Sequence, residues 1–431
     1  MILRLSNSAQ RGTLVLVAFL AALLLSYSSI RNARAQYFAG LQTRDGFERA
    51  TQLEPGDARN WYLLARYWQF NLEDSDPQRA IHAYKNAVSL DPHSAEYWLG
   101  LGSAFESVGD IAAARDAFVQ AEKAYPLSAE VTWQYGNFLL RQGELQTAFA
   151  HMRRAVQADP KRGAEAFSRS LRAEPDVDQI LDRVLPPIRD VNVDVIWDQI
   201  VDGHPENALR VWDRLAATHP SLPLQDIFPL MSALLAKNQI AEARRVWDQA
   251  VVFAGMADLQ SPPGSVLWDG GFESGISGGG FSWFFSEHSG GVQISMDSSE
   301  KHSGKHSLRL SFDGKSNVNF LDACHYVPVQ PSTPYRFSSW VQAKNLSSDQ
   351  GIRFQLRSLG LQDNSVVTTP DVRGTQPWTR VEIPWVSGND VQEMQVCLTR
   401  FPSDQDENRI QGTAWVDDVA LIPVSGEHSN P

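Results

Sequence analysis

The chain has 431 residues, of which 43% are hydrophobic and 20% charged, and its formal net charge is −12. It is longer than one ordinary domain, and its composition changes near Pro262-Pro263, which predicts separate parts on either side. The acidic balance argues against a nucleic-acid partner and against an anionic lipid surface, because binding phosphate requires clustered Lys and Arg.

An apolar run near the amino terminus predicts a membrane-spanning helix. No charge occurs in residues 13–30, and these 18 residues approach the lower limit of about 17–25 for a bilayer span. A cleaved signal peptide is the alternative, since Ala33-Arg34-Ala35 has the A-x-A form of a peptidase site. The charges of Arg31 and Arg34 favour an uncleaved anchor in residues 1–36. We expect a single-pass protein of a bacterial inner membrane facing the periplasm or exterior, or a secreted chain if cleavage occurs.

The next part of the chain repeats with a fixed period. Pro92, Pro126 and Pro160 lie 34 residues apart. Each period predicts two short helices joined by a tight turn, as at Gly109-Asp110. Such a hairpin has too much apolar surface to fold alone and should stack on copies of itself. The positions that recur with this period are Trp98/Thr132, Gly102/Gly136, Gly109/Gly143, Ala114/Ala148, Phe118/Met152 and Ala121/Ala155.

This pattern, W-x2-L-G-x2-F followed by G, A-x3-F-x2-A and P, resembles the tetratricopeptide repeat. The resemblance implies an α-helical solenoid in residues 37–255 that acts as a scaffold for protein–protein interaction. Residues 162–201 match the repeat poorly, and Pro186-Pro187 must interrupt a helix there. We therefore expect an irregular helical connection within one solenoid.

In arrays of this family the first helix of each hairpin lines a concave groove. The aromatic, amide and guanidinium groups predicted there suit an extended peptide, held by stacking and hydrogen bonds. A solvated inner face without a ligand is the competing interpretation. The predicted groove residues are Arg66, Gln69, Trp133, Asn137 and Arg141.

Residues 256–265 predict a linker, and residues 266–424 predict an all-β part ahead of a short tail, 425–431. Polar residues alternate there with apolar ones, and Gly, Pro, Asn and Asp separate the runs. Such short strands predict an antiparallel sandwich or jelly roll. The fold class is thus multidomain α + β: a transmembrane helix, an α-solenoid and a β-sandwich. The predicted strands are 306–312, 335–341, 352–356, 379–383, 391–399 and 414–421.

The order of motifs in this part resembles the galactose-binding-like jelly roll of carbohydrate-binding modules. The motifs are Asp269-Gly270-Gly271-Phe272-Glu273, residues 304–310, residues 335–341 and Val416-Asp417-Asp418-Val419. In that family the first and last strands meet, and the resemblance implies that Glu273 and Asp417 could hold a structural Ca²⁺. The alternative is that both are ordinary acids making hydrogen bonds.

Sugar binding is a separate expectation. Flat aromatic rings stack on pyranose rings, so Trp283, Phe284, Phe285, Trp378 and Trp385 are candidates, with core packing as the alternative. We interpret Trp340 as a packing residue of a core strand. The two cysteines, Cys324 and Cys397, form either a disulfide or two buried thiols.

We find no motif that predicts an active site, so we expect a non-catalytic protein. The two resemblances together favour a membrane-anchored scaffold in the cell envelope that docks a protein partner. Its sandwich would bind a glycan during assembly or export of a surface polysaccharide. One alternative is a pure protein-interaction module without sugar binding. Another is a glycan-active enzyme with appended modules, which would need two carboxylates across a cleft.

Overall fold

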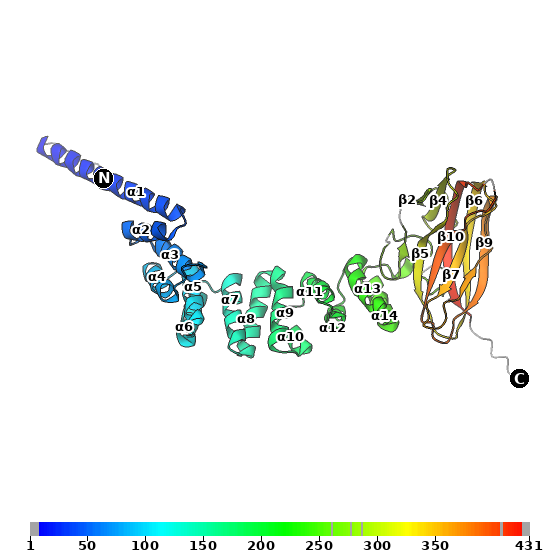
Figure 1. The fold of residues 1–431 in the computed structure, drawn as a ribbon, viewed down its shortest axis with the longest axis horizontal. Helices are drawn as coiled ribbons and strands as arrows, with labels where there is room; N and C mark the ends of the chain where they lie inside the picture. Colours follow the sequence, from blue (N-terminus) through cyan, green and yellow to red (C-terminus); the bar gives the residue numbers. More distant parts are fainter. Residues whose placement is uncertain (1–7, 260–261, 276–277, 286–287, 406–407, 425–431) are drawn as a thin grey trace. The chain divides into compact units, whose positions relative to one another are not determined.

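The structure is a computed structural model that describes residues 8–259, 262–275, 278–285, 288–405 and 408–424 (Figure 1). The chain forms two compact units, Met1–Pro186 and Pro187–Pro431. The first is helical, and the second contains further helices followed by a two-layer β-sandwich. The predicted order of a helical solenoid before an antiparallel sandwich is confirmed.

The first unit begins with one long helix, α1 (Ser8–Gly40). Its segment Arg11–Gly40 contains an 18-residue window with a mean hydropathy of 2.2 and is long and apolar enough to cross a membrane, a property that it shares with signal sequences. Side chains such as Leu16 and Leu24 are exposed. The predicted apolar helix is therefore present.

The last turns of α1 pack against the next helix, α2 (Arg44–Leu53). Ala35 is fully buried. The Arg31 guanidinium donates two hydrogen bonds to the Glu54 carboxylate, at 2.8 and 2.9 Å. The Ala33-Arg34-Ala35 sequence thus lies inside a continuous helix that belongs to the folded solenoid.

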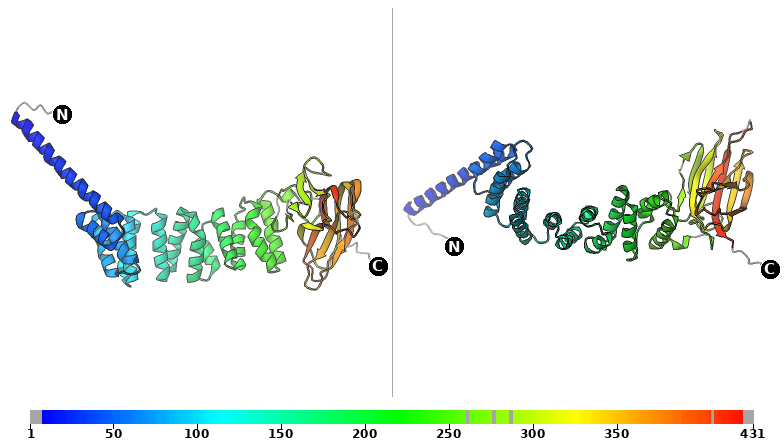
Figure 2. Two further views of the ribbon diagram at one scale, coloured as in Figure 1. Left: turned by 45° about the horizontal axis from the view of Figure 1, so that its top comes forward. Right: turned by 60° about the horizontal axis from the view of Figure 1, so that its bottom comes forward.

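Helical hairpins follow at the predicted spacing, and successive hairpins of this unit lie side by side (Figure 2). Gly109 and Gly143 adopt φ of +78° and +75°, the left-handed conformation that ends a helix and that glycine adopts without strain. The Asp110 carboxylate accepts a hydrogen bond from Ala113 N at 3.1 Å and caps the following helix. The helices are α3 (Ala58–Phe70), α4 (Pro77–Leu90), α5 (Ala95–Ser107), α6 (Ile111–Ala124), α7 (Ala129–Arg141), α8 (Leu145–Ala158), α9 (Gly163–Ala173) and α10 (Val177–Arg183).

Aromatic rings fill the space that small residues leave between the helices. A Cβ on Gly102 would lie 3.1 Å from the Phe118 ring, and one on Gly100 would lie 2.4 Å from the Tyr84 ring. Phe118 in turn packs on Phe138, with ring centroids 4.9 Å apart. The two glycines therefore allow one hairpin to accept a ring from its own second helix and from the preceding repeat.

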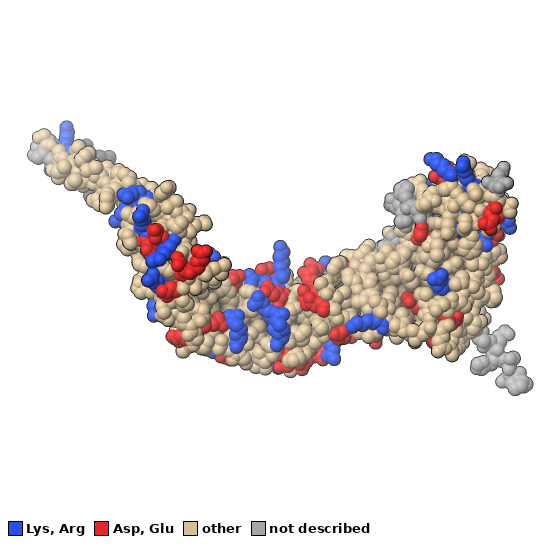
Figure 3. Space-filling view, viewed as in Figure 1, with Lys and Arg blue, Asp and Glu red and all other residues tan. Residues whose placement is uncertain are grey.

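Ion pairs connect neighbouring repeats on the surface. Basic and acidic side chains lie next to one another over the helices in Figure 3. Since both signs alternate, the charges tie repeats together instead of forming a patch of one sign. The pairs between repeats are Arg115–Glu144, Arg141–Glu106, Arg154–Glu122 and Arg162–Glu130.

The second unit starts with four more helices. The stretch predicted as an irregular connection is instead built from regular helices on both sides of Pro186-Pro187, so that prediction was wrong in detail. The break at the two prolines is present, because it separates α10 from α11. The helices are α11 (Arg189–Val201), α12 (Pro205–Ala216), α13 (Phe228–Ala236) and α14 (Ile240–Phe253).

Two antiparallel sheets form the sandwich. The five-stranded sheet has the order β1-β5-β10-β7-β8, and the six-stranded sheet has the order β2-β3-β4-β11-β6-β9. Residues such as Phe337, Leu310 and Val396 fill the core between them. The strands are β1 (Trp283–Phe284), β2 (His288–Ser289), β3 (Val292–Asp297), β4 (Ser307–Asp313), β5 (Phe320–Pro328), β6 (Pro334–Leu346), β7 (Arg353–Ser358), β8 (Val366–Thr368), β9 (Gly374–Val386), β10 (Glu393–Arg400) and β11 (Gln411–Pro423).

The last helix of this unit packs directly on the sandwich. The Trp247 ring of α14 contacts Trp268 and Phe281 edge-on, with centroids 5.2 and 5.9 Å apart. Gly280, at φ +56°, approaches the Trp247 ring so closely that a Cβ would lie 2.4 Å away. The final repeat and the sandwich therefore share an aromatic interface.

Candidate functional site

A groove of three adjoining pockets follows the helices of the first unit. Their volumes are about 740, 540 and 260 Å³. Arg66 and Phe70 line both the first and the second pocket. Ser103, Glu130 and Gln134 line both the second and the third. The shared walls join the pockets into one groove that begins where α1 ends.

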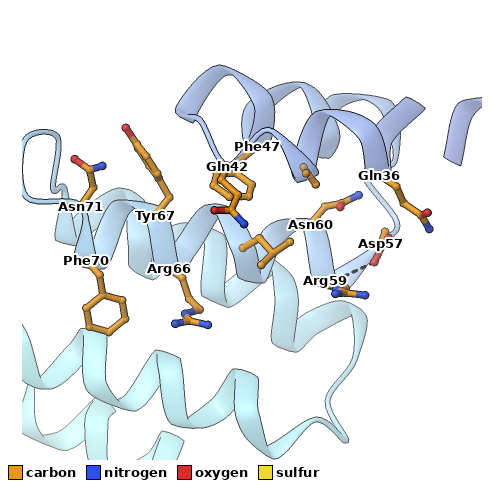
Figure 4. Close-up of a pocket in the computed structure, with 13 residues that line it drawn as sticks. Gln36, Gln42, Phe47, Asp57, Arg59, Asn60, Arg66, Tyr67, Phe70 and Asn71 are labelled. Atoms are coloured by element: carbon orange, nitrogen blue, oxygen red, sulfur yellow. Dashed lines mark hydrogen bonds between the residues drawn. The ribbon is translucent and has the colours of Figure 1, made fainter. Parts of the chain in front are cut away.

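The first pocket lies between α3 and the junction of α1 with α2 (Figure 4). Arg59, Leu63, Arg66 and Phe70 recur at intervals of three and four residues, which places them along one face of α3. In Figure 4, Arg66 and Phe70 extend from α3 on the side away from Gln42. This face alternates guanidinium groups with apolar side chains and can contact both kinds of group on a ligand.

All five predicted groove residues line these pockets, and three of them reach the surface most directly. Arg66 is exposed between two pockets. Gln69 lines the second pocket, where it donates to Ser103 Oγ at 3.1 Å and accepts from Tyr84 Oη at 2.7 Å. Arg141 lines the third pocket and forms two hydrogen bonds with Glu106, at 2.7 and 2.8 Å.

The other two predicted groove residues, Trp133 and Asn137, are only 8% and 6% exposed. The Arg162 and Arg169 guanidiniums cover the Trp133 ring, 5.1 and 5.2 Å from it. Asn137 donates to Trp133 O at 2.9 Å and accepts from Arg169 at 2.7 Å. Both residues contribute to the wall of the third pocket. Their place in the groove lining is as predicted, but neighbouring arginines cover much of both side chains. Contact of these two residues with a peptide stays a prediction.

Two of the predicted sugar-binding aromatics belong to the sandwich core. Trp283 is 1% exposed and Trp385 is 4% exposed. The Trp283 indole donates to Asp269 O at 3.1 Å, and its ring packs on Phe272 at 4.9 Å. Trp385 packs on Tyr335 at 5.7 Å. Neither ring can stack on a sugar, so these two assignments were wrong.

The remaining aromatics lie nearer the surface. Phe285 is partly buried against the core. Trp378 is half-buried and meets the His302 ring edge-on at 5.7 Å. Trp340, interpreted from the sequence as a core residue, instead lies half-buried on the outer face of the six-stranded sheet. There His302 stacks on it at 4.0 Å. His302 and Asp418 hydrogen-bond at 2.6 Å, which holds the imidazole over that ring.

The outer face of the five-stranded sheet carries the predicted candidate Phe284 together with polar and aromatic residues that the sequence analysis did not identify. Tyr326, Gln395 and Arg357 are direct neighbours on β5, β10 and β7. Phe284 of β1 meets Tyr326 edge-on at 5.5 Å. Alternation in residues 353–357 does place Arg353, Gln355 and Arg357 on one face. Only the strand order, however, shows which residues flank them.

The two carboxylates proposed for calcium are engaged by backbone N–H groups. Glu273 Oε1 accepts from Lys305 N at 2.5 Å and His306 N at 3.1 Å. Asp417 Oδ2 accepts from His302 N at 2.8 Å, and burial raises the pKa of Asp417 to about 6. Within the residues that the structure describes, no three metal-binding side chains come together. Binding of Ca²⁺ by Glu273 and Asp417 stays a prediction, and a cation there would have to displace the N–H groups that these oxygens now accept from.

The two cysteines lie opposite each other on β5 and β10 and form a disulfide. Cys324 is 9% exposed and Cys397 is 1% exposed. The bridge joins strands whose cysteines are 73 residues apart in sequence. Of the two alternatives from the sequence, the structure therefore has the disulfide and not the free thiols.

Comparison with family profiles gives two matches. One profile, described as tetratricopeptide repeat, matches residues 72–109 and 104–163. The other, described as carbohydrate binding domain, matches residues 264–400. Both describe modules that bind other molecules and have no catalytic role of their own.

Individual proteins share smaller parts of the chain. Tetratricopeptide repeat protein 33 of Mus musculus is 36% identical over 85 residues, and its Homo sapiens counterpart is 35% identical. These matches cover 20% of this chain and 31% of each relative, so the chain spans about a third of their length.

Solved structures match parts of the chain at low identity and low TM-score. The CBM22-1 xylan-binding domain of Xyn10C from Paenibacillus barcinonensis is 14% identical. It covers 33% of this chain and 86% of its own, with a TM-score of 0.25. YrrB, a tetratricopeptide repeat protein with an unusual peptide-binding site, is 17% identical. It covers 50% of this chain and 96% of its own, with a TM-score of 0.26.

Proposed function

We propose that this protein, in which tetratricopeptide repeats precede a carbohydrate-binding jelly roll, is a membrane-anchored scaffold of the cell envelope. Its groove would hold an extended segment of a protein partner, and its sandwich would hold a glycan. The setting that uses both is assembly or export of a surface polysaccharide. The two profile matches, at residues 72–163 and 264–400, support this combination of ligands.

The proposed anchor is α1, retained in the mature protein. A peptidase must reach the bonds at its cleavage site, but Ala35 is fully buried inside a helix that packs on α2. The Arg31–Glu54 ion pair holds the same turns. Location outside the cytoplasm is supported by the disulfide, since such bridges persist in oxidising compartments.

The observation that carries the scaffold proposal is the continuous groove of three pockets. Its lining offers Arg66 for a carboxylate, Gln134 for a backbone amide and Phe70 for an apolar side chain, whereas Arg141 and Gln69 already hydrogen-bond other residues of the groove. An extended peptide can present a carboxylate, backbone amides and apolar side chains along its length, since its backbone amides have no hydrogen-bond partners within the peptide. Small residues of α5 leave the middle of the groove open.

A photo-crosslinking amino acid placed in the groove tests the scaffold proposal. Gln134 lines the second and third pockets, so a crosslinker there should form a discrete protein adduct in membranes of the native cell. A second change, Arg66→Glu, should reduce that adduct at least fivefold, because it replaces the exposed positive charge between the first two pockets with a negative one. The matched control is a crosslinker at Asp116, which is exposed on α6 outside these pockets. Equal labelling at both positions, or no effect of Arg66→Glu, would contradict peptide capture.

For the glycan, the proposed site is the outer face of the five-stranded sheet. Tyr326 and Phe284 offer partly exposed rings for stacking, and Gln395 beside them can hydrogen-bond sugar hydroxyls. On the other sheet, the half-exposed rings of Trp340 and Trp378 already contact His302. The rings of the five-stranded sheet instead have the Gln395 amide beside them.

A further inference from the structure

The strand register of the five-stranded sheet builds a row of three different groups. Tyr326 on β5 is the direct partner of Gln395 on β10, which is the direct partner of Arg357 on β7. Side chains of directly paired residues point to the same face of a sheet. The Gln395 amide donates to Tyr326 Oη at 3.3 Å and so fixes the middle of the row.

A second row lies beside the first on the same face. It contains Phe284, the Cys324–Cys397 disulfide and Gln355, which are paired across β1, β5, β10 and β7. Gln355 is 8% exposed, so its amide lies low in the surface. The disulfide joins β5 to β10 in the middle of this face, between the strand that carries Phe284 and the strand that carries Arg357.

Arg357 is one of two exposed arginines of the sandwich strands, with Arg336 of β6, that form no ion pair among the described residues. It is exposed, and among the described residues no carboxylate comes within 4 Å of its guanidinium. By contrast, Arg353 on the same strand pairs with Asp371 at 3.4 Å, and Arg380 pairs with Glu382 at 3.2 Å. A guanidinium left without an acid, two strands from an aromatic ring, is available to an anion.

We propose that this face binds a polysaccharide containing acidic sugars, with Arg357 pairing with the carboxylate of a uronic acid residue. Tyr326 stacks on the sugar ring, and Gln395 and Gln355 bind its hydroxyls. The inference rests on the proposed glycan binding and adds the chemical class of the glycan. The discriminating residue is Arg357, because the rings and amides would serve a neutral sugar equally well.

The dimensions of the face suit this ligand. Neighbouring strands lie about 4.8 Å apart, so Tyr326 and Arg357 are separated by about 10 Å at the backbone. The long arginine side chain can fold back over part of that span, which brings the guanidinium to the edge of a ring stacked on Tyr326. The net charge of −12 repels a polyanion in general, so recognition must depend on this local pairing.

The test compares one polymer in two forms. Binding of the full-length protein in detergent is measured to polygalacturonate and to the same polymer after reduction of its carboxyl groups, in non-reducing buffer with EDTA. Wild-type protein should bind the acidic form about tenfold more tightly, as a charge-assisted bidentate contact permits. Arg357→Gln should remove the preference, and Arg357→Lys should keep part of it. Arg336→Gln, an exposed arginine of the other sheet, is the matched control and should change nothing.

The outcomes separate the two proposals. Equal binding of both polymers, or an unchanged preference in Arg357→Gln, overturns the acidic-sugar inference and leaves the proposed glycan binding intact. Failure of folded wild-type protein to bind either polymer or any neutral glycan overturns both. Far-ultraviolet circular dichroism of every variant verifies that the protein tested is folded.

Discussion

Glu393 is an acid whose surroundings oppose its charge. It lies on β10, two residues from Gln395, and its Oε1 is buried with no hydrogen-bond partner. Burial alone raises its pKa from 4.5 to about 7. Because the folded pKa exceeds the unfolded one, the stabilising effect of protonation is complete below about pH 4.5. It is lost as the pH rises through about 7.

Replacing this carboxyl with an amide should therefore stabilise the protein only at high pH. We expect Glu393→Gln to raise the free energy of unfolding by about 1–2 kcal/mol at pH 8, where the wild type carries a buried charge, and to change it little at pH 5. Thermal unfolding followed at both pH values measures the effect. Glu382→Gln on exposed β9 serves as the control. A gain that is equal at pH 5 and pH 8 would show that Glu393 does not titrate as described.

For individual residues, the sequence predicted the chemical type of a site better than it predicted which side chains are buried. It identified the disulfide as one of two alternatives and all five residues that line the groove. For Trp283 the alternative of core packing holds, whereas Trp340, interpreted as a packing residue of a core strand, is half-buried on an outer face. Alternation along β6 separates Trp340 from Phe337 and Val341, but alternation alone cannot say which face is covered by the second sheet. Burial depends on the partner sheet, which a single strand does not encode.

Among the helices, Gly100 shows how closely the first hairpins approach each other. It lies on α5, and Tyr84 of α4 is packed against it with 1% exposure. The Tyr84 hydroxyl is held by Gln69, so the ring cannot easily move aside. The absence of a side chain at this position is thus a packing requirement and not only room for a ligand.

Adding one methyl group at this position should consequently destabilise the solenoid. We expect Gly100→Ala to lower the free energy of unfolding by about 1–3 kcal/mol, despite the higher helix propensity of alanine. Chemical denaturation monitored by far-ultraviolet circular dichroism checks this. The control is Gly56→Ala, since a Cβ at Gly56 meets nothing within 4 Å. An unchanged or increased stability of Gly100→Ala would mean that the two helices can separate without cost.

Helices and strands that a local sequence pattern marks were predicted well. Contacts that depend on pairing between segments far apart in the sequence were not predicted. The 34-residue period located the hairpins because their helices contact their sequence neighbours. Strands such as β7, β10 and β11 were predicted from alternation. The neighbour relation between β5 and β10 joins segments about 70 residues apart, so no local pattern could predict the row from Tyr326 to Arg357. The candidate glycan face therefore required the sheet order.

For the molecule as a whole, the long first helix determines where the groove operates. Because α1 runs without a break to Gly40 and its last turns line the first pocket, an anchored chain would place this pocket close to the membrane surface. A partner segment bound in the first pocket would then also lie near the membrane. This follows from continuity of the helix and not from any contact with lipid.

Retention of that helix is directly measurable. The intact mass of the protein purified from native membranes should include residues before Gln36, and alkaline carbonate should not extract it from the membrane. The control is a soluble exported protein of the same host that has a cleavable signal peptide, because its cleavage shows that the peptidase is active. A mature chain beginning at Gln36 in the soluble fraction would exclude the anchor and favour secretion.

The contact of Trp247 with Trp268 and Phe281 bears on how such a chain can change during evolution. Modules joined by an open tether can be exchanged one for another, because nothing on either surface has to match. Here the last repeat presents an indole that the sandwich covers, and Gly280 makes room for it. A foreign sandwich would have to bring the same aromatic pair and the same glycine, or leave Trp247 exposed to water. The final helix and the sandwich therefore form one unit for exchange, because replacing the sandwich alone would remove the cover of Trp247.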